Sequence, residues 1–171
     1  MAKSKRLIKQ MVDGQINLFE EEDRKLKAFK QDTLRYLSAG NATFTLESTK
    51  IDKRYTYKVY HRKNDKCENR YIISVMYGPN NNDDFKYLGL WYKDTGVFKV
   101  PASRQSTVDT SGWQYKMFNT FIKLLYTDAL IPDTCKFYKS GKCACCGRKL
   151  TTPESIELGI GPDCYERLMK K

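Results

Sequence analysis

Residues 54–61, "RYTYKVYH", alternate along the chain with a period of two, which is typical of a β-strand with one buried face. One face would carry Tyr55, Tyr57 and Val59, and the other Thr56, Lys58 and Tyr60. Because aromatic and branched residues pack well on a pleated surface, this stretch predicts a sheet as the centre of the fold.

Four further segments share this composition. They are "TFTLEST" (43–49), "YIISVMYG" (71–78), "FKYLGLWY" (85–92) and "GVFKV" (96–100). Turn-forming clusters such as "GPNNNDD" (78–84) and "KDTG" (93–96) separate them. We therefore expect a five-stranded antiparallel meander. In 85–92, strict alternation would place Phe85, Tyr87 and Trp91 opposite Lys86, Leu88 and Leu90.

Two segments have helical periodicity. Residues 20–37 place Leu26, Phe29, Leu34 and Leu37 on one stripe, and residues 112–130 do so with Trp113, Met117, Phe121, Leu124 and Leu125. The second helix should cover the sheet. We predict an α+β chain with a flexible basic tail at 1–19, an amphipathic helix at 20–40, a sheet domain at 41–132 and a small annex at 133–171.

The net charge of +11 favours a polyanionic partner, DNA or RNA first. Basic and aromatic side chains on the exposed sheet face and in the annex are the candidate contacts: Arg54, Lys58, Tyr60, Lys86, Arg148 and Lys149. Two simpler interpretations stay open. The charge could serve solubility alone, and an aromatic stripe at strand spacing is typical of core packing.

Residues 141–164, "GKCACCGRKLTTPESIELGIGPDC", contain four of the six cysteines. Cys143 and Cys146 form a C-x2-C pair before Gly147, and Cys164 follows "GIGP" near the start of a final helix. No apolar run approaches the length of a membrane span, so we expect a soluble protein in a reducing compartment, where clustered cysteines are typical metal ligands.

A structural zinc site of the treble-clef or ribbon type needs a fourth ligand. Cys135 is favoured by its distance from the pair, while Cys145 and His61 are the alternatives. No histidine near the cluster could activate a thiol, and the neighbouring acidic residues have an ordinary helical context. We therefore predict a closed structural site and a protein that is not an enzyme.

The same stretch resembles a small zinc-ribbon-like domain of unknown function that is common in bacteriophage proteins, with the pattern C-x2-C-G-R-x-L-T-x-P-x-S-I-x-x-G-x-G-P-x-C. The upstream segments "GNATFTLES", "RYTYKV" and "DFKYLGL" extend the likeness over roughly 40–171. The chain has Lys139 where family members carry a histidine, which strengthens the case for Cys135. The resemblance implies phage origin and the host bacterial cytoplasm, but no activity.

Near the N-terminus, Gln15, Ile16, Asn17, Leu18 and Phe19 resemble the pentapeptide that binds the bacterial sliding clamp. Such a peptide inserts Leu and Phe into an apolar pocket. Alternatively, Ile16, Leu18 and Phe19 could staple the following helix to the body.

These features predict a phage accessory protein that binds nucleic acid or a nucleic-acid-processing complex. The alternative is a phage inhibitor of a host restriction, CRISPR or replication protein, acting by protein–protein binding.

Overall fold

The computed structural model describes residues 2–62, 65–79 and 84–170, with side chains described from residue 20 onward except at 106. A long helix, α1 (Ala2–Leu37), leads into a six-stranded antiparallel sheet with the strand order β5-β4-β3-β2-β1-β6. The strands are β1 (Asn41–Ser48), β2 (Lys53–Tyr60), β3 (Arg70–Met76), β4 (Phe85–Tyr92), β5 (Val97–Lys99) and β6 (Cys135–Lys139). The predicted α+β fold class is confirmed.

The sheet has one strand more than expected, because β6 lies in the segment assigned to the annex. Residues 135–139 pair antiparallel with β1, opposite 44–48. A five-residue strand between a proline turn and a cysteine pair has too little alternation to be distinguished from a loop in the sequence. The annex proper therefore begins after Lys139.

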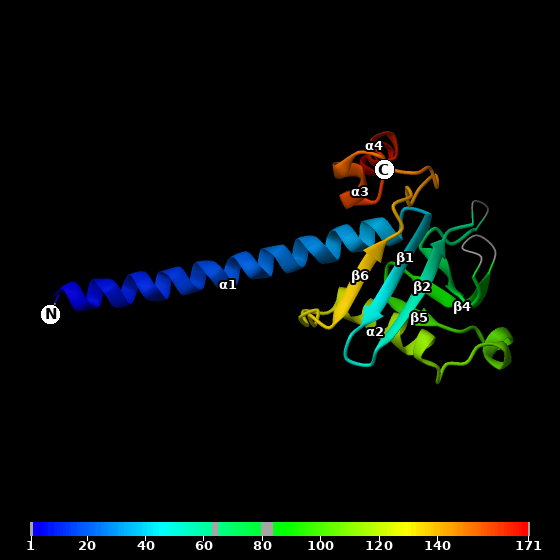
Figure 1. Cartoon of the computed structure of the whole chain (residues 1–171), viewed down its shortest axis with the longest axis horizontal. Coiled ribbons are helices and arrows are strands. Elements are labelled where there is room, and N and C mark those ends of the chain that lie inside the picture. Colours follow the sequence, from blue (N-terminus) through cyan, green and yellow to red (C-terminus); the bar gives the residue numbers. More distant parts are fainter. Residues whose placement is uncertain (1, 63–64, 80–83, 171) are drawn as a thin grey trace.

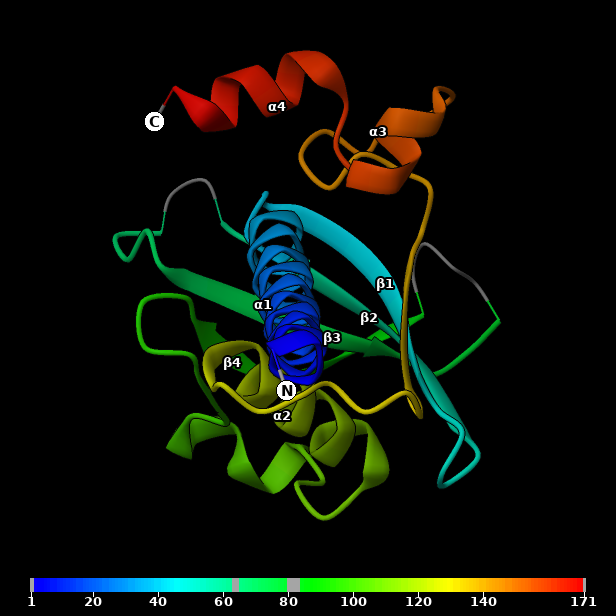
Figure 2. The same ribbon diagram turned by 90° about the vertical axis from the view of Figure 1, so that its left-hand side faces the viewer.

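The core lies between one face of the sheet and two helices, the end of α1 and α2 (Trp113–Tyr126) (Figure 2). Fully buried rings meet at its centre: the centroid of Phe44 is 5.6 Å from Tyr57 and 6.3 Å from Phe118. Tyr57 also donates a hydrogen bond to the Gln114 carbonyl at 2.9 Å. The predicted division of β2 holds, since Tyr57 and Val59 are buried while Lys58 and Tyr60 are partly exposed.

Helix α1 begins at Ala2, whereas we expected a flexible tail up to residue 19. Residues 2–37 contain no proline and a single glycine, so the helix that packs on the body can extend backwards. It projects far from the body (Figure 1). No helix in the described part of the chain has both the length and the apolar character needed to cross a membrane.

A β-bulge in the pairing of β3 with β4 changes which residues of β4 share a face. The register shifts between Ile73 and Ser74, so that Ser74 pairs with Tyr87 while Ile73 pairs with Gly89. Tyr87 thus lies on the face opposite the fully buried Trp91, although strict alternation would place them together.

The annex carries two short helices, α3 (Pro153–Leu158) and α4 (Pro162–Met169), above the end of α1 (Figure 1). The backbone N–H of Asn41 donates to the Ala144 carbonyl at 2.6 Å, and the backbone N–H of Ala144 donates to the Gly159 carbonyl at 2.9 Å. Gly159 has a φ of 74°, and a Cβ there would lie 2.4 Å from the Tyr36 ring. Close packing of backbone on an aromatic ring therefore fixes the annex to α1.

Candidate metal centre and basic sheet face

A tight hairpin presents the first two cysteines of the annex. Lys142 and Lys149 form an antiparallel bridge, and the Cys143 amide donates to the Arg148 carbonyl at 2.8 Å. The turn closes at Gly147, whose φ of 77° favours glycine. This geometry is the knuckle in which backbone amides surround a thiolate.

The third cysteine comes from the first turn of α4. Pro162 occupies the start of this helix, where its missing amide costs nothing. The sulfur atoms of Cys143, Cys146 and Cys164 all lie within 4.8 Å of one another. A tetrahedral ion bound about 2.3 Å from each sulfur would need sulfur separations of about 3.8 Å. The three thiols are therefore placed to hold a metal ion with little movement.

Hydrogen bonds favour the ionised form of one of these thiols. Burial alone would raise the pKa of Cys143, but backbone N–H groups, that of Gly161 first, bring it down to about 7. The Gly161 nitrogen is 3.3 Å from the Cys143 sulfur. By contrast, burial and the neighbouring thiols raise the pKa of Cys164 to about 12. Arg167 donates to the Cys164 sulfur at 3.1 Å, so its guanidinium would balance the charge of a Cys164 thiolate.

The expected fourth ligand, Cys135, is not brought to this cluster. It pairs with Ser48 at the start of β6, and four strand residues separate it from the annex, roughly 13 Å of extended chain. Burial raises the pKa of its thiol. His61 is also elsewhere: its Nε2 lies 3.3 Å from the Cys67 carbonyl oxygen. Cys145 is half-buried in the knuckle and its thiol interacts with that of Cys164, but its sulfur does not belong to the group of three that lie within 4.8 Å of one another.

The sheet face opposite α1 and α2, which we call the open face, carries cations and aromatic rings in alternation. Each of the following pairs places a charged group over a ring, with centroid distances between 5.1 and 5.9 Å: Arg54 with Tyr138, Lys58 with Phe85, Lys99 with Tyr92 and Arg104 with Tyr87. Strand pairing places these rings on one continuous surface from β6 to β5.

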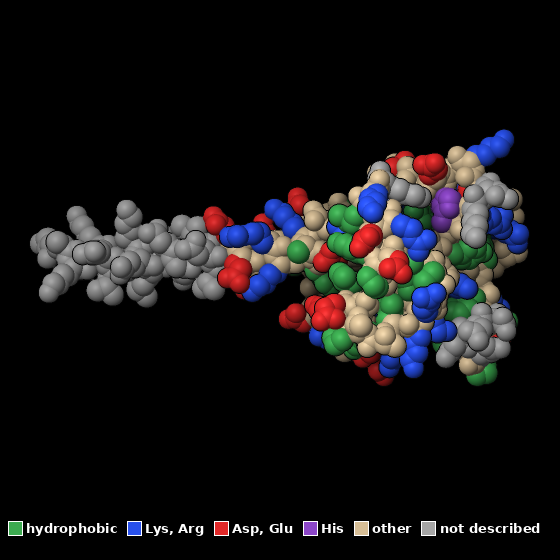
Figure 3. Space-filling model, turned by 90° about the horizontal axis from the view of Figure 1, so that it is seen from above, with side chains coloured by type: hydrophobic (Ala, Val, Ile, Leu, Met, Phe, Trp, Pro, Cys, Tyr) green, Lys and Arg blue, Asp and Glu red, His purple; other side chains and the backbone are tan. Residues whose placement is uncertain are grey.

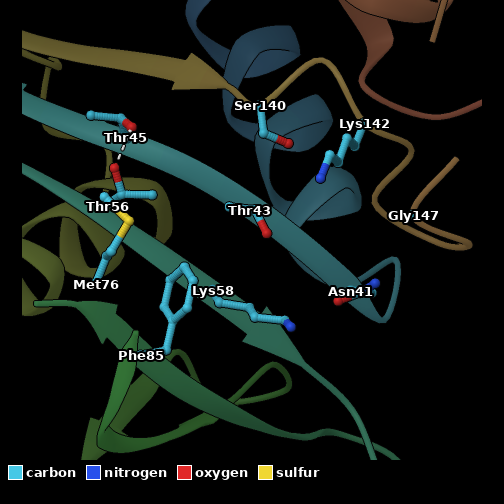
Figure 4. Close-up of a pocket in the computed structure, with 10 residues that line it drawn as sticks. All are labelled: Asn41, Thr43, Thr45, Thr56, Lys58, Met76, Phe85, Ser140, Lys142 and Gly147. Atoms are coloured by element: carbon cyan, nitrogen blue, oxygen red, sulfur yellow. Dashed lines mark hydrogen bonds between the residues drawn. The ribbon is translucent and has the colours of Figure 1, made fainter. Parts of the chain in front are cut away.

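A polar hollow of about 450 Å³ lies on the open face next to the annex (Figure 4). Its lining includes the ammonium groups of Lys58 and Lys142, together with hydroxyl and amide groups from Asn41, Thr43, Thr45, Thr56 and Ser140. Among the described residues that line it there is no carboxylate. A second hollow, lined by Tyr60, Tyr87 and Arg104 among others, continues along the same face. The second hollow also contains the carboxylate of Asp65, which is paired with Arg70.

The structure brings together only some of the predicted nucleic-acid contacts. Arg54, Lys58 and Tyr60 lie on the open face, and Arg148 and Lys149 are exposed in the knuckle beside the polar hollow.

Lys86 is separated from them. It pairs with the buried Val75 and so follows the register of the opposite face.

Further cations on or beside the open face were missed in the sequence, among them Lys99, Arg104 and Lys142. Lys99 could have been found by alternation, because its neighbour Phe98 is buried. Arg104 could not, because the 3-10 helix Ala102–Thr107 that carries it has no periodic signal.

The clamp-like segment, residues 15–19, has its backbone within α1. Its side chains lie outside the described residues.

Residues 137–169 match a family of unknown function (DUF6011). The match covers the end of β6 and the annex with its three clustered cysteines, and agrees with a C-terminal metal-binding domain. The comparisons with curated proteins and with solved structures gave no match.

Proposed function

We propose that the protein is a non-enzymatic phage accessory factor that binds single-stranded DNA or RNA along its open face, in the cytoplasm of a host bacterium. The observation that carries this proposal is the polar hollow, whose described lining has two ammonium groups and no carboxylate, set in a row of cation–aromatic pairs. Phosphates need cations and hydrogen-bond donors, and bases need flat apolar surfaces. The open face offers both.

The contacts divide by chemistry. Lys58 and Lys142, with the neighbouring hydroxyl groups, would bind phosphates in the polar hollow. The rings of Phe85, Tyr87 and Tyr138 would stack with bases, the cation beside each ring turning to a phosphate. A duplex presents no free bases to such rings, so we expect a preference for single strands.

The metal in this proposal is zinc, held by Cys143, Cys146 and Cys164 with Cys145 as the fourth donor. Four sulfur ligands suit a closed tetrahedral structural site, which supplies folding free energy rather than catalysis. Its role would be to order the knuckle, because the knuckle places Lys142 over the polar hollow.

The proposal is tested by fluorescence anisotropy with labelled twenty-nucleotide oligomers of thymidine and uridine. If about five phosphates are contacted, raising the salt from 50 to 200 mM should weaken binding roughly 100-fold. Lys58→Glu should weaken it about tenfold or more at the lower salt. The matched control is Lys123→Glu, on the exposed side of α2, which makes the same charge change away from the open face. No binding at 50 mM salt, or equal losses in both variants, would reject the proposal.

Docking on the bacterial sliding clamp through Gln15, Ile16, Leu18 and Phe19 is a separable part of the proposal. Because this segment is helical in the free protein, clamp binding in an extended form would require the start of α1 to unwind. Leu18→Ala with Phe19→Ala should abolish co-elution with a clamp while leaving oligonucleotide binding unchanged. If co-elution survives the double substitution, the segment does not bind the clamp.

A pull-down from host lysate with and without nuclease addresses the alternative, an inhibitor of a host protein. A stoichiometric partner that survives nuclease, in a protein that binds no oligonucleotide, would favour the inhibitor.

A further inference from the structure

Strand β6 is an edge strand, and its outer backbone groups are free to pair. The Ser140 amide donates to the Thr43 carbonyl of β1 at 3.1 Å, which identifies these two residues as a hydrogen-bonded pair. In an antiparallel ladder the hydrogen-bonded pairs alternate, so the N–H and C=O groups of Phe137 and Lys139 point away from β1. Among the described residues, no backbone partner is found for them.

A groove runs along this edge, with α1 on one side and α3 on the other. It is lined by Phe29, Asp32 and Thr33 of α1, Phe137, Tyr138 and Lys139 of β6, and Glu154, Ile156, Glu157 and Leu158 of α3. Its volume is about 690 Å³. We call it the β6 groove.

Apolar side chains remain exposed in the β6 groove after folding. Phe29 is 42% exposed, Ile156 45% and Leu158 37%. The Phe29 ring meets Phe137 edge to face at 6.4 Å, so its position is fixed by packing. An apolar floor beside an unpaired strand edge matches the two requirements of peptide binding by strand addition: backbone hydrogen bonds and pockets for alternate side chains.

The charge of the β6 groove is opposite to that of the protein. Its described lining has three carboxylates, those of Asp32, Glu154 and Glu157, and one ammonium, that of Lys139. That ammonium is already bonded to the Glu157 backbone carbonyl. Asp32 is paired with Arg35 at 2.8 Å, which leaves Glu154 and Glu157 for a ligand. Seen from above, acidic and hydrophobic side chains lie together on the body beside the point where α1 leaves it (Figure 3). Nucleic acid is therefore an unsuitable occupant, whereas a basic segment is attracted.

We infer that the β6 groove binds an extended peptide segment of a partner protein, with alternating apolar and basic side chains, which adds a seventh strand at β6. The apolar side chains would contact Phe29, Ile156 and Leu158, and the basic ones Glu154 and Glu157. This surface is distinct from the open face proposed for nucleic acid, and the inference does not depend on that proposal.

The direct probe is a fluorescein-labelled peptide of four valine-lysine repeats, titrated against the full chain by anisotropy. Its charge control has four valine-glutamate repeats. Two further peptides carry N-methyl groups on alternate amides, in the two possible phases. Strand addition uses every second amide of the peptide, so one phase should abolish binding and the other should leave it within about threefold. Equal effects of the two phases would contradict strand addition.

Variants of the groove complete the test. Ile156→Glu and Leu158→Glu should each weaken the valine-lysine peptide about tenfold or more, because each places a charge on the apolar floor. Leu130→Glu is the matched control, since Leu130 is 75% exposed and lies outside the groove. Glu154→Lys with Glu157→Lys should shift preference to the glutamate peptide.

Three outcomes would overturn the inference. The first is no binding of the valine-lysine peptide up to about 1 mM. The second is equal loss in Leu130→Glu and Leu158→Glu. The third is a concentration-dependent dimer in sedimentation analysis that Leu158→Glu dissociates, which would make a second copy of the chain the occupant.

Discussion

Replacement of Lys30 by methionine should destabilise the body, although a lysine on a helix would normally be placed at the surface. The residue is only 7% exposed, and its Nζ donates to the carbonyls of Thr127 and Ala129, each at 2.7 Å. These carbonyls follow the C-terminus of α2, where backbone acceptors lack helical partners. The ammonium therefore links α1 to the end of α2.

The magnitude follows from these two bonds. A hydrogen bond to a charged donor contributes about 1.5–3 kcal/mol. Thr127 and Ala129 are exposed residues, so water would replace part of the loss, and we expect Lys30→Met to lower the free energy of unfolding by about 2–4 kcal/mol. With a urea m-value of about 2 kcal/mol/M, the unfolding midpoint should fall by about 1–2 M.

Circular dichroism during urea unfolding provides the assay. The matched control is Lys27→Met on the same helix, whose ion pair with Asp23, at 3.5 Å, is solvent-exposed and contributes at most about 0.5 kcal/mol. If Lys30→Met and Lys27→Met unfold at the same urea concentration, Lys30 does not link the helices as described.

Three further predictions concern the annex, a loop and the contact between annex and body. If the cysteine cluster binds zinc as proposed, Cys164→Ser should abolish the metal content of the purified protein and raise amide exchange after residue 139, while the sheet keeps its protection. Asp65 has its pKa lowered from the ordinary 3.8 to about 2, chiefly by its bond to Arg70. Its contribution to stability is therefore present above about pH 4 and lost toward pH 2. In Arg70→Gln the urea midpoint should depend less on pH between pH 4 and pH 2. Gly159→Ala should lower the free energy of unfolding more than Gly141→Ala does in the same unfolding assay. Both have positive φ, which alone costs about 1 kcal/mol, but only at Gly159 would a Cβ meet a ring.

The sheet and the cysteine cluster were predictable because the sequence patterns that specify them span only a few residues. Alternation in β2 assigned Tyr57 and Val59 to the core and Lys58 to the other face, as found. The spacing of Cys143, Cys146 and Cys164 predicted their meeting, since a knuckle and a helix start are both defined within a few residues.

The features that the sequence did not predict depend on contacts between distant segments. The β6 strand is specified by pairing with β1 rather than by its own alternation, and Cys135 was misplaced with it. The bulge opposite Ser74 reverses the face of Tyr87, which strict alternation cannot anticipate. In α2, Trp113 is exposed whereas Phe118 is buried, because Phe118 is on the side of the helix that packs against sheet rings such as Phe44.

The central claim, that the open face binds single-stranded nucleic acid, is tested most directly by photo-crosslinking an oligonucleotide of 4-thiothymidine to the protein and mapping the attached residues by mass spectrometry. Binding along the open face should give crosslinks to its rings, at Tyr60, Phe85, Tyr87 and Tyr138, that disappear at high salt. Crosslinks confined to α1 or α2, or none at low salt, would contradict it.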